Sequence, residues 1–92
     1  MKIKNIELKN ISTGLVFKDE LGKDITAFGV CINALGFTKT NNPLLSYRLS
    51  LALLDKDEVE LTSEEITHIK SVINSSDNYT PSVIGQILNH LE

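Results

Sequence analysis

The chain has 92 residues, the usual length of a single domain, and we expect one domain over residues 1–92. Its 41% hydrophobic and 23% charged content is that of a folded protein, which excludes a disordered chain. No apolar run approaches the roughly 20 residues of a membrane span or forms the centre of a signal peptide, and the single cysteine excludes an internal disulfide. We therefore predict a soluble cytoplasmic protein without a membrane partner.

Positive and negative side chains are divided unevenly along the chain. Residues 1–54 hold seven Lys and Arg against four Asp and Glu, a balance of +3, and residues 55–92 hold two Lys against eight Asp and Glu, a balance of −6. A phosphate backbone is bound by several cations in one patch. The second part of the chain is therefore expected to disfavour nucleic acid and to attract a basic partner.

The N-terminal part of the chain has the pattern of a β-ribbon. Ile6 and Leu8 alternate with polar residues within the segment 2–11, as in a half-buried strand. Gly14 interrupts this pattern, and Leu15–Phe17 is a second segment rich in β-prone residues. A polar stretch then predicts an exposed turn.

From about residue 25 the apolar residues recur at the spacing of a helix. Four apolar residues fall at helical spacing: Ile25, Phe28, Ile32 and Leu35. Gly36 is placed to cap the end of this helix. Gly29 and the β-branched Val30 weaken a helix, so a strand through Thr26–Ile32 is the alternative interpretation of residues 25–35.

Asn42 and Pro43 predict the start of a second helix, because Asn is a favoured N-cap and Pro fits the first helical position. This helix is expected to run through Asp55. Its apolar residues line most of one side: Leu44, Leu45, Leu51, Ala52 and Leu54. Leu49 and Leu53 widen the apolar surface. This breadth predicts a helix that is central in the fold or contacts a partner, including a second copy of the chain.

Two further helices have the clearest local signals. Thr62 and Glu65 have the spacing of a capping box, in which each side chain accepts a hydrogen bond from the other residue's amide. The buried stripe of this helix is expected to consist of Ile66, Ile69, Val72 and Ile73. Thr80 and Pro81 predict the start of the last helix, with Val83, Ile84, Ile87, Leu88 and Leu91 on one face. We predict an α+β fold: an N-terminal two-stranded β-ribbon followed by about four helices, the last two forming an α-hairpin.

The same two helices carry a resemblance to a known family. Glu60–Lys70 matches the pattern E-L-T-x-E-[ED]-I-x-x-I-K, Pro81–Gln86 matches P-x-V-x-G-Q, and Leu91-Glu92 matches the family's ending. Over about a third of its length the chain resembles small phage and prophage proteins of unassigned function. The resemblance implies a viral or prophage origin, and thus the cytoplasm of a host cell. It brings no catalytic residue.

No residue of the chain is predicted to be catalytic or to bind a cofactor or a metal. Carboxylates alternate with other residues in the segment 55–60, as at the start of a calcium loop. Glu60, however, occupies the sixth position, where a calcium loop requires glycine. His68 and His90 lack a carboxylate or cysteine partner at ligand spacing, and both are expected to be exposed. Cys31 lies beside an apolar helix face and is expected to be a small buried hydrophobic residue.

We therefore expect a non-enzymatic phage-type accessory protein that acts through protein–protein contacts, in virion assembly or by inhibiting a host defence protein, and that self-associates. The partner-binding candidates are the acidic residues Asp55, Asp57, Glu58, Glu60, Glu64 and Glu65, which would speed encounter with a basic partner. The alternative is a DNA-binding regulator that uses the helix pair 63–91, with Ser82, Gln86 and Asn89 as the face that contacts bases. This pair holds one lysine and no arginine, so we expect no binding to duplex DNA at physiological salt.

Overall fold

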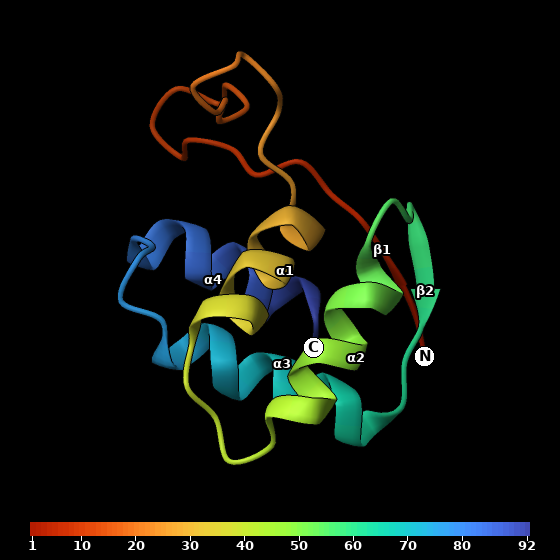
Figure 1. The fold of residues 1–92 in the computed structure, drawn as a ribbon. Coiled ribbons are helices and arrows are strands. Elements are labelled where there is room, and N and C mark those ends of the chain that lie inside the picture. The colour runs from red at the N-terminus through yellow and green to blue at the C-terminus, as the bar shows by residue number, and fades with distance from the viewer.

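The computed structural model describes all residues from Met1 to Glu92, which form two short strands and four helices (Figure 1). In chain order these are β1 (Lys2–Lys4), α1 (Ala27–Phe37), α2 (Pro43–Leu53), β2 (Glu58–Glu60), α3 (Ser63–Ser75) and α4 (Pro81–His90). The predicted α+β class, with a two-stranded antiparallel sheet and four helices, is confirmed. None of the four helices has the length and the apolar character needed to cross a membrane.

The sheet joins the N-terminus to the segment between α2 and α3. Ile3 of β1 lies opposite Val59 of β2, and Ile3 is buried in the core. On the other face, residues of opposite charge lie across from each other, Lys2 with Glu60 and Lys4 with Glu58, and such cross-strand pairs stabilise a sheet. The strand that pairs with β1 is thus β2, whereas the sequence pattern places the second strand at Leu15–Phe17.

Residues 5–26, the N-terminal lobe, form an irregular structure in place of a regular ribbon. Phe17 N–H donates to the Leu8 carbonyl over 2.8 Å, Leu8 N–H to the Ile25 carbonyl over 2.9 Å, and Ile25 N–H to the Phe17 carbonyl over 2.8 Å. A single isolated bridge, Lys9 with Val16, and no continuous ladder connects the two segments predicted to be strands. The lobe projects beyond the helices, and Leu21 within it is 83% exposed (Figure 1).

The helical interpretation of residues 25–35 is confirmed by α1. This helix begins after Thr26, whose Oγ1 accepts a hydrogen bond from the Gly29 N–H over 3.1 Å. Its buried residues are Ala27, Phe28, Val30, Cys31, Ala34 and Leu35. The prediction of Gly36 as the C-cap is wrong, because Gly36 does not adopt the positive φ of a capping glycine and the helix continues to Phe37.

Helix α2 begins as predicted but turns a different face to the core. The Asn42 side chain accepts a hydrogen bond from the Leu45 N–H over 3.2 Å, and Pro43 follows as the first helical residue. The buried residues are Ser46, Leu49 and Leu53. Most of the apolar side described from the sequence is exposed: Leu44 is 55%, Leu51 52% and Leu54 50% exposed. Ser46 hydrogen bonds to His68 on the next helix, and Leu49 and Leu53 enter the core one turn apart on the same side.

The last two helices pack as the predicted pair. Thr62 and Glu65 form the capping box: Glu65 N–H donates to Thr62 Oγ1 over 3.1 Å, and Thr62 N–H donates to Glu65 Oε1 over 2.8 Å. The stripe predicted for α3 is buried, namely Ile66, Ile69, Val72 and Ile73. Thr80 is the N-cap of α4, but its side chain makes no capping hydrogen bond.

Replacing Thr62 with alanine is expected to lower the free energy of unfolding by about 1 kcal/mol, because it removes an acceptor from the first amides of α3. Thr80→Ala is the matched control, since it makes the same change at an N-cap without a side-chain hydrogen bond. Urea unfolding followed by circular dichroism measures both. Equal losses in the two variants would contradict the role given to the capping box.

Candidate functional site

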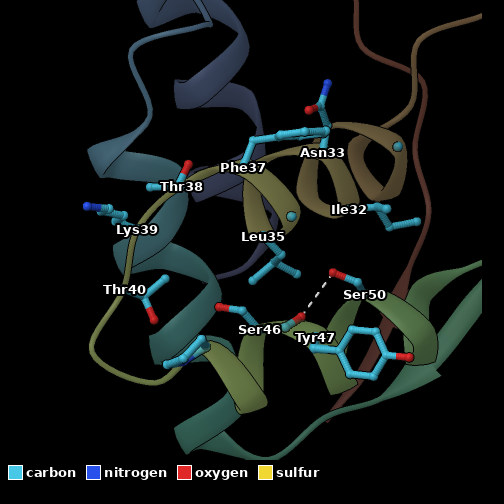
Figure 2. Close-up of a pocket in the computed structure, with 13 residues that line it drawn as sticks. Ile32, Asn33, Leu35, Phe37, Thr38, Lys39, Thr40, Ser46, Tyr47 and Ser50 are labelled. Carbon is cyan, nitrogen blue, oxygen red and sulfur yellow. Dashed lines mark hydrogen bonds between the residues drawn. The ribbon is translucent and has the colours of Figure 1, made fainter.

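An open groove lies between the second half of α1 and the first turns of α2, and we call it the α1–α2 groove (Figure 2). Its cavity volume is about 770 Å³. One wall comes from α1, the other from α2, and residues 38–40 of the connecting loop close one end. The large apolar side chains that line it are Ile32, Leu35, Phe37, Pro43 and Tyr47.

The groove exists because small residues face each other across the two helices. Gly29 and Gly36 contribute to the wall from α1, and Ser46 and Ser50 to the wall from α2. A Cβ atom added to Gly36 would meet no atom within 4 Å, so the space beside this residue is empty. Serine and glycine side chains are too short to fill the gap between two packed helices, whose axes lie 8–10 Å apart in general.

The rim of the groove exposes large apolar side chains. Phe37 at the end of α1 is 82% exposed, and Tyr47 of α2 is 63% exposed. Tyr47 also belongs to a row of exposed residues that we call the α2 stripe, namely Leu44, Tyr47, Leu51 and Leu54. Residues three and four apart share one side of a helix, so these four form one continuous apolar surface. Contiguous exposed apolar surface of this kind is typical of interaction sites.

The polar groups in the floor of the groove are satisfied within the protein. Ser46 is 3% exposed, and its Oγ lies 2.8 Å from Nε2 of His68 in α3. Ser50 Oγ donates a hydrogen bond to the Ser46 carbonyl over 2.9 Å (Figure 2). The prediction that His68 is exposed is therefore wrong: it is half-buried and joins α3 to α2. No carboxylate hydrogen bonds to His68, so the serine–histidine pair lacks the third group that orients a catalytic imidazole.

Two other residues considered for chemistry are held in structural contacts. Cys31 is buried in the core, as predicted, and burial raises the pKa of its thiol from 9.0 to about 12. A thiol with such a pKa stays protonated at neutral pH and is a poor nucleophile. His90 lies in the last turn of α4, where Nε2 hydrogen bonds to the Lys4 carbonyl and ties α4 to β1. The structure contains no group of three or more His, Cys, Asp or Glu residues that could hold a metal ion.

Two of the six acidic residues predicted to bind a partner make side-chain contacts within the protein. Glu60 Oε1 lies 3.1 Å from the N-terminal ammonium of Met1, and Glu65 is used in the capping box. Glu58 lies across the sheet from Lys4. The remaining three are exposed: Asp55 and Asp57 lie in the turn after α2, and Glu64 lies in the first turn of α3. The two aspartates are thus the candidates nearest to the α2 stripe in the chain.

The three residues of the alternative DNA-contacting face differ in how far their side chains are free to contact DNA. Gln86 Oε1 accepts a hydrogen bond from the Lys9 N–H over 3.0 Å, and Gln86 Nε2 donates to the Lys9 carbonyl over 2.8 Å. The amide that would recognise adenine is thus paired with the N-terminal lobe. Ser82 is half-buried, and Asn89 is exposed. No local pattern could have indicated the pairing of residues 77 positions apart.

Comparisons of the chain with protein-family models, with curated proteins and with solved structures find no match. The resemblance to small phage proteins therefore stays a prediction, based on the sequence patterns alone.

Because the pKa of Cys31 is raised, we expect the protein to become less stable at high pH. Below pH 9 this thiol is protonated whether the chain is folded or unfolded, so it adds no pH dependence. Between pH 9 and about pH 12 the unfolded thiol ionises and the folded one does not, so the free energy of unfolding falls as the pH rises. At pH 10 we expect a decrease on the order of 1 kcal/mol relative to pH 7.

Urea unfolding of the wild type and of Cys31→Ala at both pH values isolates this effect, because the other ionisable groups are common to the two proteins. The wild type is expected to lose more stability than the variant between pH 7 and pH 10. Parallel losses, or rapid alkylation of the native thiol by iodoacetamide at pH 8, would show that Cys31 is accessible to solvent.

Proposed function

We propose that the chain is a non-enzymatic accessory protein of phage type that acts through protein–protein contacts made at the α1–α2 groove and its rim. The single observation that supports this proposal is the open apolar groove, about 770 Å³ in volume, beside Phe37 and Tyr47, which are 82% and 63% exposed. Aromatic side chains are enriched among the residues that contribute most to protein binding.

The acidic charge that favours a basic partner lies at the end of the α2 stripe, whereas the one charged residue that lines the groove is Lys39. Asp55 and Asp57 follow α2 directly and are exposed. A carboxylate acts through solvent over roughly 8–10 Å at physiological salt, so these two residues need not touch the partner to attract it. Their main effect is on the rate of association and on its salt dependence.

The resemblance of Glu60–Lys70 and Pro81–Gln86 to phage proteins supports a role in an infected cell. In the cytoplasm of such a host, the partner would be either another component of virion assembly or a defence protein that the chain inhibits. Both roles require a binding surface, and neither requires catalysis.

The alternative, a DNA-binding regulator, has less support. Its residue Gln86 is paired with Lys9, and residues 55–92 hold two lysines against eight acidic residues. Phosphate contacts from Lys and Arg supply much of the affinity for DNA. We expect no change in fluorescence anisotropy when labelled duplex DNA is titrated with the protein at physiological salt, and micromolar binding that weakens steeply with salt would favour the alternative.

Affinity capture from a bacterial host extract, quantified by mass spectrometry, tests the proposed function. Phe37→Glu places a charge on the rim of the groove, and we expect it to reduce the amount of captured partner at least about tenfold, because an unpaired charge would be buried on binding. Leu21→Glu is the matched control, since Leu21 is 83% exposed and lies in the N-terminal lobe, away from the groove lining.

The control variant is expected to capture the same partner in the same amount as the wild type. A partner that binds Phe37→Glu and the wild type equally would contradict a binding site at the groove. Asp55→Lys combined with Asp57→Lys is expected to slow association and to reverse its salt dependence, which surface plasmon resonance measures.

A further inference from the structure

The residues of the α2 stripe are spaced symmetrically along the helix. Its members Leu44, Tyr47, Leu51 and Leu54 are separated by three, four and three residues, and each is at least 50% exposed. This spacing is the same in both directions along the chain. The midpoint falls at residue 49, and Leu49 itself points into the core and is 1% exposed.

Two copies of such a helix fit each other when they run antiparallel about a two-fold axis at residue 49. Leu44 then lies opposite Leu54 of the second copy, and Tyr47 lies opposite Leu51 of the second copy. Each apolar residue therefore meets an apolar residue. A two-fold interface requires this property, because the same patch of both subunits must be complementary to itself.

The charges at the ends of α2 favour the antiparallel arrangement. The helix has no acidic residue in its first turn and no basic residue in its last turn, so neither end of its dipole is neutralised by a side chain within those turns. Antiparallel pairing brings Asp55 and Asp57 of one copy toward the positive N-terminal end of α2 in the other. Parallel pairing would instead bring the two acidic turns together, which is unfavourable.

The area of the α2 stripe sets the strength of the contact. Eleven residues of α-helix extend over about 16 Å, and a helix with its side chains is about 10–12 Å wide. The resulting contact is smaller than the roughly 800 Å² that each partner contributes to a stable interface. A dimer of this size is weak and reversible, with a dissociation constant on the order of 0.1 mM.

We propose that a second copy of this chain covers the α2 stripe, in a two-fold antiparallel pair of α2 helices centred on residue 49. This inference rests on the proposed function, in which the chain works through protein contacts, and it names one of the partners. It leaves most of the α1–α2 groove open for a different protein, because the groove extends from Tyr47 toward α1 and the connecting loop.

Sedimentation velocity of the full chain, from about 10 µM to about 1 mM, measures the association. The wild type is expected to change from a 10.2 kDa monomer to a dimer across this range. Tyr47→Lys and Leu51→Glu each place a charge against an apolar residue of the second copy, so each variant alone should dimerise at least about tenfold more weakly. Both positions are more than 50% exposed in the monomer, and circular dichroism confirms that each variant is folded.

An equimolar mixture of the two variants gives the most specific result. In the antiparallel pair the introduced ammonium lies opposite the introduced carboxylate, and the wild-type Leu51 of one chain lies opposite the wild-type Tyr47 of the other. We therefore expect the mixture to dimerise within about threefold of the wild type, although neither variant does so alone. Leu21→Glu serves as the control for added charge and should behave like the wild type.

Three results would overturn the proposal: a wild type that stays monomeric at 1 mM, a Leu51→Glu variant that dimerises like the wild type, or a mixture that remains monomeric. The proposed function fails separately. It is contradicted when Phe37→Glu retains the captured host protein, whatever the state of association. A wild type that captures that protein but stays monomeric contradicts only the antiparallel pair.

Discussion

Helix α1 is apolar on nearly all sides, and the rest of the fold is arranged to cover it. Six of its eleven residues are buried, and Phe28 and Cys31 line the centre of the core together with Leu53 of α2, Ile69 of α3 and Ile87 of α4. Burial of such side chains is the main driving force for folding, at roughly 1.5–3 kcal/mol for a large aliphatic or aromatic residue. Each covering helix meets α1 through one narrow face, and this constraint decides which residues of the other elements remain outside.

The consequence is clearest in α2. Three residues, Ser46, Leu49 and Leu53, complete its contact with the core. No other element of the structure covers the opposite side of α2. The leucines at 44, 51 and 54 and Tyr47 therefore stay exposed, and the short side chains between α1 and α2 leave the groove open. The proposed binding surface is thus the part of an apolar helix that a small core does not cover, and burial of its exposed area would provide a driving force for association.

The features that could be predicted from the sequence are those encoded locally. The caps at Asn42 and Thr62 involve residues three positions apart, and the stripes of α3 and α4 each follow a single helical period. The inner face of α2 could not be predicted, because apolar residues occupy both sides of this helix and the correct side includes the polar Ser46. Ser46 is buried because His68 provides a hydrogen-bond partner 22 residues away. The pairing of β1 with β2 and of Gln86 with Lys9 likewise depends on residues that only the complete fold brings together. The groove is defined by short side chains, which form no periodic pattern in the sequence, so it could not be predicted either.

The core uses one side of α2 and leaves the other side exposed, where we propose that a partner binds. The most direct test of this division is the free energy of unfolding, measured by urea denaturation at low protein concentration, for Leu44→Ser, Leu51→Ser and Leu54→Ser and for the buried control Leu49→Ala. Each of the three exposed positions is expected to change the stability of the monomer by less than about 0.5 kcal/mol. Leu49→Ala is expected to lower it by about 2–5 kcal/mol, because it opens a cavity in the core. A loss of several kcal/mol at Leu44, Leu51 or Leu54 would place these leucines inside the fold and would contradict the account.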